Sequence, residues 1–228
     1  MLASRDKELE RWRQLWRGDD IPFHRPDVHP DLVEFGDAIL EGGPHRILVP
    51  LCGKSVDMAY LTERGHEVIG VEVVERAVTE FFEERGLRPE VEAVDRLTMY
   101  RAGSLTVVRG DIFEIDRSHV GQVDRIWDRA ALVALPAHMR GDYTRHLRQL
   151  AAPGWAMLLS SIEYDTTVMS GPPWSVPEEE IRLHYPGASF ERLARRDALD
   201  RAPHMRERGH TWLTESTYLI TDGSAPSP

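Results

Sequence analysis

Short apolar runs alternate with amphipathic stretches along most of this chain. Each run is continuous rather than alternating, which is typical of a strand buried on both faces of a parallel sheet. The runs cover residues 47–51, 66–72, 105–109, 123–128 and 155–162. The stretches that we expect to be helices lie between them, at residues 56–64, 75–85 and 136–150. Strands that alternate with helices predict an α/β domain with right-handed crossovers between mostly parallel strands.

The two ends of the chain add elements of other kinds. We expect further helices at residues 5–17, 31–40 and 178–183, and an antiparallel pair of strands at residues 189–195 and 211–220. Residues 87–103 show no clear period. The predicted fold is a three-layer αβα sandwich around a mostly parallel, seven-stranded sheet that ends in an antiparallel hairpin. Residues 1–222 would form one domain with an N-terminal helical lid (about 1–42), and residues 223–228 a disordered tail.

Composition and charge narrow the range of functions. The chain has 28 Lys and Arg residues against 38 Asp and Glu, a net charge of −10 that disfavours binding to duplex nucleic acid. Its one cysteine, Cys52, allows no internal disulfide. No apolar run approaches the roughly 18 residues that cross a bilayer, and the charged N-terminus lacks the apolar core of a signal peptide. We expect a cytoplasmic monomer with no nucleic-acid or membrane partner.

Ligands of such sheets bind at the carboxyl ends of the strands, so we expect the functional residues in the turns that follow the strands. The first turn reads Pro50-Leu-Cys-Gly-Lys-Ser55 and ends like a phosphate-binding loop. That motif needs another glycine where Leu48 stands, and the dinucleotide fingerprint needs two further glycines that are also missing. The turn therefore lacks a phosphate cradle, although Gly53 still lets a ligand approach the backbone closely. A plain strand-to-helix turn is the alternative.

Glu72 ends the second strand, 19 residues after Gly53. In nucleoside-binding α/β folds an acid at this place accepts hydrogen bonds from the ribose hydroxyls. An exposed glutamate at a strand end is the alternative interpretation. This acid, combined with a turn that lacks phosphate glycines, favours S-adenosylmethionine over a dinucleotide, because S-adenosylmethionine has no phosphate. Asp111 and Ile112, which follow the third strand, would then lie beside the adenine.

Arg129 follows the fourth strand and would face the reacting end of the ligand, where a guanidinium can hold a carboxylate or an electron-rich ring. A structural ion pair with Asp128 or Asp124 is the alternative. The aromatic residues placed to line or cover this site are Trp12, Trp16, Phe23, Trp127 and Trp174. Such rings suit a flat substrate and a sulfonium cation. Trp12 and Trp16 would equally form the apolar face of a docked helix.

No signature of a metal site or a nucleophile accompanies these residues. The ten histidines form no H-E-x-x-H motif, a cysteine pair is impossible, and a G-x-S-x-G elbow does not occur. Cys52 lies beside the first turn, but a lone cysteine at a strand end is more often a packing residue than a nucleophile. We expect no bound metal.

Several longer stretches resemble the thiopurine S-methyltransferase family. The matches are Trp12-x3-Trp16-x6-Phe23-His24, Val49-Pro-Leu-Cys-Gly-Lys-Ser55, Gly65-His-x-Val-x-Gly-Val-Glu72, Asp111-Ile-Phe113, Ile126-Trp-Asp-Arg-x-Ala-Leu132 and Gly171-Pro-Pro-Trp-x-Val-Pro177. The similarity extends from about Trp12 to Ile220. The paired sequences PLCGKS and IWDRxAL are far more specific than a general nucleoside fingerprint. The resemblance implies a class I methyltransferase fold that uses S-adenosylmethionine and releases S-adenosylhomocysteine.

The resemblance also implies roles for individual residues. It suggests that the contacts with the methyl donor fall on Trp12, Trp16, Leu51, Glu72, Asp111, Ile112 and Arg129. Phe23 would line the substrate pocket, and Arg206 is the candidate for a late basic residue near the substrate. The implied reaction is in-line methyl transfer to the sulfur of an aromatic or heterocyclic thiol such as a thiopurine. Arg129 would act as the catalytic residue by favouring the thiolate or orienting its ring.

Three other functions stay open. The protein could methylate small thiols, halides, or selenium and tellurium compounds. It could be a nucleotide-dependent oxidoreductase on a similar sheet, which the missing second and third glycines disfavour. It could also be a binding module that keeps the cofactor site without turnover, which the presence of Asp128, Arg129 and the aromatic loop at residues 171–177 disfavours.

Overall fold

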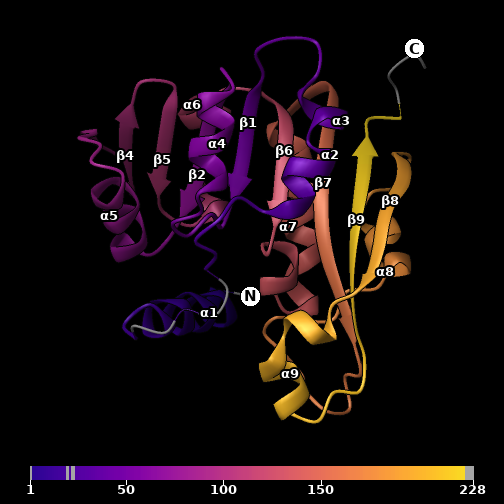
Figure 1. Cartoon of the computed structure of the whole chain (residues 1–228). Coiled ribbons are helices and arrows are strands. Elements are labelled where there is room, and N and C mark those ends of the chain that lie inside the picture. Colours follow the sequence, from indigo (N-terminus) through magenta and orange to yellow (C-terminus); the bar gives the residue numbers. More distant parts are fainter. Residues whose placement is uncertain (1, 19–20, 22–23, 224–228) are drawn as a thin grey trace. The chain divides into compact units, whose positions relative to one another are not determined.

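The computed structural model describes residues 2–18, 21 and 24–223 of the chain, which divides into two compact units. Unit 1 contains Met1–Pro30 and Pro44–Gly121, and unit 2 contains Asp31–Gly43 and Gln122–Pro228. Figure 1 shows the elements of both, and the units are described one at a time. None of the helices in the described part of the chain has the length and apolar character that a bilayer crossing requires.

Unit 1 contains five strands that lie in the order β3-β4-β5-β2-β1. Its strands are β1 (Arg46–Pro50), β2 (Glu67–Glu72), β3 (Glu90–Val94), β4 (Leu97–Ala102) and β5 (Leu105–Arg109). β2 pairs in parallel with β1 on one side and with β5 on the other, with Val49 opposite Gly70 and Glu72 opposite Arg109. The apolar runs predicted at 47–51, 66–72 and 105–109 are thus confirmed as parallel strands.

The strands β3 and β4 were not predicted from the sequence. They form an antiparallel hairpin at the edge of unit 1, and β4 also runs antiparallel to β5. β3 is almost wholly exposed and carries Glu90 and Glu92, so it lacks the apolar pattern that marks a buried strand. Asp95 turns the hairpin with a positive φ of 54°. The predicted strand number of seven omits this pair, although the predicted α/β fold class is confirmed.

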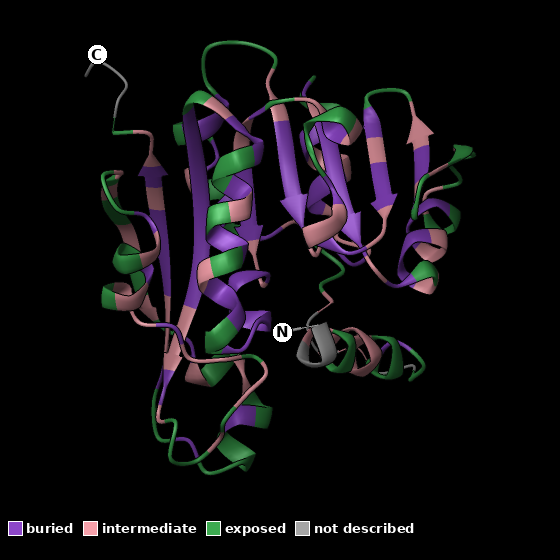
Figure 2. Ribbon diagram, turned by 180° about the vertical axis from the view of Figure 1, so that it is seen from behind, coloured by how far each residue is buried: buried purple, intermediate pink, exposed green. Residues whose placement is uncertain are grey.

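The helices of unit 1 are α1 (Leu2–Leu15), α4 (Asp57–Glu63), α5 (Glu75–Glu84) and α6 (Arg117–Val120), with a 3₁₀ turn η1 (Ile112–Glu114). α4 buries Met58 and Leu61, and α5 buries Phe81 and Phe82 on one face. Figure 1 and Figure 2 both show α1 beyond the ends of the parallel strands of this unit rather than against a sheet face. The helix predicted at residues 5–17 therefore exists, but it begins three residues earlier and ends two residues earlier.

Unit 2 contains four strands that lie in the order β6-β7-β9-β8. Its strands are β6 (Val123–Arg129), β7 (Ala151–Tyr164), β8 (Ser189–Asp197) and β9 (Leu213–Thr221). β6 and β7 are parallel, whereas β9 runs antiparallel to both β7 and β8. The predicted terminal hairpin of β8 and β9 is confirmed, and β8 is the more exposed of its two strands. Residues 224–228 of the predicted tail lie outside the described residues.

The helices of unit 2 are α2 (Pro30–Phe35), α3 (Asp37–Leu40), α7 (Ala137–Leu150), α8 (Glu178–His184) and α9 (Pro203–Glu207), with 3₁₀ turns η2 (Leu132–Ala134) and η3 (Leu199–Arg201). The single helix predicted at 31–40 is interrupted at Gly36. Asp31 fixes the start of this segment, because its carboxylate accepts hydrogen bonds from Thr217 Oγ1 at 2.5 Å and from Arg196 at 2.6 Å. The single-domain organisation stays a prediction.

Gly70, in the middle of β2, generates a prediction about packing in unit 1. A Cβ atom at this position would lie 2.5 Å from Met58 Sδ and 2.8 Å from Cys52 Sγ, both buried. Gly70→Ala should therefore lower the free energy of unfolding by about 1–3 kcal/mol, measured by urea denaturation. The control is Gly141→Ala on α7, where the nearest atoms lie at 3.9 Å and better helix propensity should stabilise the protein. A Gly70→Ala protein as stable as the wild type would contradict this explanation.

Candidate active site

The turn after β1 in unit 1 is held by Glu72. The two oxygens of this carboxylate accept hydrogen bonds from two backbone amides, Gly53 N–H at 2.9 Å and Val74 N–H at 2.8 Å. Leu51 and Gly53 both have positive φ, of 48° and 53°, so the backbone bends sharply between the strand and α4. A non-glycine residue in this conformation costs about 1–3 kcal/mol, which the surrounding hydrogen bonds offset. The structure thus brings together the predicted turn and the predicted acid.

Glu72 is a buried carboxylate, only 7% exposed, so the alternative of an exposed strand-end glutamate is wrong. Burial raises the pKa of its carboxyl, and the N–H groups of Val74 and Gly53 act in the opposite direction. A carboxylate has about four lone-pair positions, so the two backbone hydrogen bonds leave room for further donors. A ligand diol would supply two such donors.

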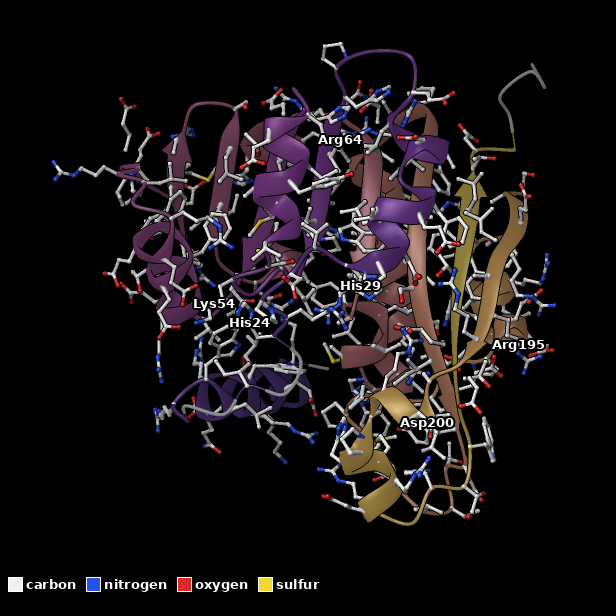
Figure 3. The ribbon with its side chains drawn as sticks, in the orientation of Figure 1. His24, His29, Lys54, Arg64, Arg195 and Asp200 are labelled. Atoms are coloured by element: carbon white, nitrogen blue, oxygen red, sulfur yellow. The ribbon has the colours of Figure 1, made fainter. Side chains whose placement is uncertain are left out.

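The amide and the ammonium that a phosphate-binding loop would use are both engaged elsewhere. Gly53 N–H donates to Glu72, and Lys54 Nζ lies 2.7 Å from Glu80 and 2.6 Å from Glu84. Figure 3 shows Lys54 beyond the ends of the unit 1 strands, on the side where α1 lies. The resemblance of Gly53-Lys54-Ser55 to a phosphate loop therefore does not extend to its geometry. Ser55 Oγ instead accepts the N–H of Asp57 at 3.3 Å at the start of α4.

Trp16 forms an apolar wall at this turn. It is 3% exposed and belongs to a cluster with Val74 and Ala77, against which Trp12 also packs. Its ring atom Cζ2 lies 3.1 Å from the place that a Cβ on Gly53 would occupy. Trp16 follows directly after α1 (Leu2–Leu15) and docks the end of that segment through this cluster, which is close to one of the two interpretations, and it also lies directly against the turn.

Cys52 lies in the same turn as a buried packing residue. It is 8% exposed, and burial followed by the charge of Glu72 raises the pKa of its thiol well above the usual value. The thiol therefore stays protonated at neutral pH. A thiol in this state is a poor nucleophile, which agrees with the expectation that Cys52 is a packing residue.

Asp111 and Ile112 follow β5 and are both buried. Asp111 accepts the N–H of Phe113 at 3.0 Å, and its second oxygen lies 2.8 Å from Nε of Arg5 on α1. The Arg5 guanidinium also lies over the Phe113 ring, 5.6 Å from its centroid. Arg5 was not among the predicted site residues, because a single basic residue in a polar helix carries no local signal of its partner.

In unit 2, Asp128 shapes the turn that follows Arg129, the last residue of β6. Asp128 is fully buried, and its carboxylate accepts hydrogen bonds from Leu132 N–H at 3.0 Å and from Tyr143 Oη at 2.8 Å. Ala130 adopts a positive φ of 61° within this turn. Burial raises the pKa of Asp128 to about 6, against the opposing effects of Leu132 and Tyr143. This carboxylate therefore organises the backbone that carries Arg129.

The remaining predicted residues occupy separate places. Trp127 is fully buried in the core, so it does not line an open site. Trp174 donates its backbone N–H to Val133 O at 2.6 Å, which ties the loop at 171–177 to the turn after Arg129. Arg206 lies on α9 with an exposed side chain that pairs with Asp200, a residue labelled in Figure 3. Phe23 lies outside the described residues.

The geometry of unit 1 fits an adenosine group without phosphates. A buried carboxylate keeps hydrogen-bonding capacity, a tryptophan lies against the glycine turn, and the amide that a phosphate would need is already donated to Glu72. These features match the ribose and the apolar surroundings that S-adenosylmethionine requires. They disfavour a dinucleotide, whose pyrophosphate needs free backbone amides.

Comparison with known proteins gives one consistent result. The family model of thiopurine S-methyltransferase (TPMT) matches residues 7–223. A thiopurine S-methyltransferase of Pseudomonas aeruginosa is 40% identical over 217 residues, which cover 95% of this chain and 100% of that protein. One of Bordetella petrii is 40% identical over 214 residues, covering 93% and 98%. A solved SAM-dependent methyltransferase of Anabaena variabilis has a TM-score of 0.60 at 14% identity and 94% coverage of both chains, which confirms the predicted fold.

The burial of Asp128 generates a prediction about pH and stability. An acid with a raised pKa in the folded state stabilises the native protein fully below its unfolded pKa of 3.8, and this contribution is lost as the pH rises through about 6. The free energy of unfolding of Asp128→Asn, relative to the wild type, should therefore rise by about 3 kcal/mol between pH 4 and pH 7. Denaturant titrations at several pH values measure this difference. The control is Asp142→Asn on the exposed face of α7, which should show no such trend.

Proposed function

The chain belongs to the thiopurine S-methyltransferase family, and from that premise we propose how its own residues carry out the reaction. It is an S-adenosylmethionine-dependent enzyme that methylates the sulfur of thiopurines. We extend the acceptor class to aromatic and heterocyclic thiols in general. The observation that carries the proposal is the hydrogen bond from Gly53 N–H to the buried Glu72, because it occupies the amide that a phosphate would need and so supports a nucleoside site without phosphates.

Binding of the methyl donor is assigned to unit 1. Glu72 would accept the ribose hydroxyls with the lone pairs that Gly53 and Val74 leave available. The backbone at Leu51 would approach the ligand where the chain bends, and Trp12 and Trp16 would cover it. Asp111 and Ile112 would lie beside the adenine. When bound, S-adenosylmethionine supplies a methyl group on a sulfonium, which a thiolate accepts by in-line displacement.

Binding and orientation of the thiol acceptor are assigned to Arg129, Arg206 and Phe23. Arg129 would also contact the methyl donor, S-adenosylmethionine. Arg129 would favour the thiolate over the thiol and orient its ring, because a guanidinium stacks on aromatic faces and stabilises negative charge. Aromatic thiols ionise readily, so the residues need to position the acceptor rather than remove its proton with a strong base. Positioning of this kind contributes up to roughly 7–11 kcal/mol.

The other functions left open by the sequence make different predictions for the same assay. Purified protein is incubated with labelled S-adenosylmethionine and 6-mercaptopurine, simple thiols, iodide or selenite, and methylated products are identified by mass. We expect transfer to 6-mercaptopurine in preference to the others. Preferred methylation of iodide, selenite or small thiols would show that the acceptor is not an aromatic thiol, and binding of S-adenosylmethionine without transfer to any acceptor would indicate a binding module.

Size-exclusion chromatography tests the proposed monomer, and the cytoplasmic location stays a prediction.

Glu72→Gln should weaken binding of S-adenosylhomocysteine about 10- to 100-fold. The amide removes the charge from the hydrogen bonds to the ribose, and charge-assisted hydrogen bonds contribute about 1.5–3 kcal/mol. Isothermal titration calorimetry measures the affinity of the purified variant. Glu83→Gln, on the exposed part of α5, is the control and should bind as the wild type does. Equal affinities of the wild type, Glu72→Gln and Glu83→Gln would show that Glu72 does not bind the ligand.

Arg129→Ala should lower kcat/KM for 6-mercaptopurine at least tenfold, which is about 1.4 kcal/mol of transition-state stabilisation. The melting temperature should change little, because Arg129 is only half-buried at the end of its strand. Arg145→Ala on α7, whose guanidinium pairs with Asp142 at the surface, is the matched control. Full activity of Arg129→Ala would show that another residue meets the acceptor.

A further inference from the structure

Lys54 and Arg76 of unit 1 share one carboxylate. Glu80 on α5 lies 2.7 Å from Lys54 Nζ through Oε2 and 2.5 Å from Arg76 Nε through Oε1. Lys54 also reaches Glu84, one turn further along α5. The Lys54 ammonium first, and the Arg76 guanidinium after it, hold the pKa of Glu80 below its usual value against the effect of burial. We call Lys54, Glu80 and Arg76 the charged bracket.

The bracket extends to the turn that follows α1. Arg76 Nη1 donates hydrogen bonds to the backbone carbonyl of Trp16 at 2.9 Å and to that of Gly18 at 3.2 Å. Both carbonyls belong to the turn after Leu15, the last residue of α1, in which Trp16 N–H donates to Trp12 O and Gly18 N–H donates to Leu15 O. Arg76 therefore holds the turn that carries Trp16 and follows directly on α1.

α1 depends on such contacts. A helix of 14 residues is marginal in water by itself, and this one is mostly polar. Its apolar anchors are a small cluster in which Trp16 packs on Val74 and Ala77. The Trp16 ring lies against Gly53, the residue that Glu72 holds. A shift at the end of α1 would thus move the wall of the turn directly.

We propose that the charged bracket positions Trp16 against the Gly53 turn and thereby sets the affinity of the enzyme for its methyl donor. The inference rests on the proposed function of that turn. Lys54, Glu80 and Arg76 are positioning residues, since each acts through α1 or α5 and none has to touch the ligand. The lysine of Gly53-Lys54-Ser55 thus has a role that replaces the phosphate contact suggested by its motif.

Two substitutions test the bracket. Arg76→Gln removes the guanidinium that donates to the turn after α1, and Lys54→Met removes the charge that orients Glu80 while keeping most of the side-chain length. Titration calorimetry with S-adenosylhomocysteine should give about tenfold weaker binding for Arg76→Gln and a smaller loss for Lys54→Met. Hydrogen–deuterium exchange of the ligand-free proteins should become faster over residues 8–18 in both variants.

Global stability provides the distinction from a merely structural role. The Arg76 side chain is 40% exposed, and ion pairs with such exposure contribute little to folding, so the melting temperature should stay close to that of the wild type. Arg145→Gln on α7 breaks a comparable surface pair with Asp142 and should change neither affinity nor exchange in residues 8–18. Glu80→Gln, which weakens both pairs at once, is the second variant if Arg76→Gln does not fold.

The outcomes separate this inference from the function on which it rests. A wild-type protein that binds no S-adenosylhomocysteine would overturn the proposed function. A wild type that binds while Arg76→Gln binds with equal affinity would overturn the positioning role alone. Weaker binding with unchanged exchange in α1 would also overturn it, because the effect would then not pass through the helix. Weaker binding together with faster exchange supports it.

Discussion

The carboxylate of Glu72 is the constraint on which unit 1 of this molecule depends. It is buried at the end of β2, and it uses one oxygen for Gly53 and the other for Val74. A buried carboxylate without partners would cost several kcal/mol in folding free energy. The amides of Gly53 and Val74 remove this cost, and the carboxylate in turn holds the two backbone segments that carry them. The same two hydrogen bonds fix the backbone bend and occupy the amide that a phosphate would need.

Asp128 does the equivalent work in unit 2. It also ends a strand region, is fully buried, and accepts a backbone N–H from the turn that follows, with Tyr143 completing its partners. In both units the sequence suggests an exposed acid at the end of a strand, whereas the structure shows a buried carboxylate that accepts backbone N–H groups and so fixes the adjacent turn. Glu72 thus acts on a residue that is distant in sequence, Gly53, whereas Asp128 acts on the turn that directly follows it.

The charged residues around the first turn show how one motif can serve different chemistry. Lys54 follows a glycine as it would in a phosphate loop, yet its ammonium lies between Glu80 and Glu84. The two glutamates of α5 therefore bind the lysine as part of the protein's own structure, where a phosphate loop would use it to bind a ligand. Arg76 pairs with the other oxygen of Glu80 and donates to the carbonyl of Trp16 in the turn after α1. Charge pairs of unit 1 thus connect the turn at Gly53 with the segment that carries Trp16.

The sequence by itself determined the parallel strands, the main helices and the family, because continuous apolar runs and the PLCGKS and IWDRxAL stretches are local signals. It also indicated Glu72 and the turn at Gly53. The exposed hairpin of β3 and β4 carried no such signal, since its strands are stabilised by edge pairing rather than by burial. Only the tertiary structure decided that Arg5 pairs with Asp111 and Arg76 with the end of α1, because those partners are separated by 106 and about 60 residues and the choice among many arginines depends on folded distance.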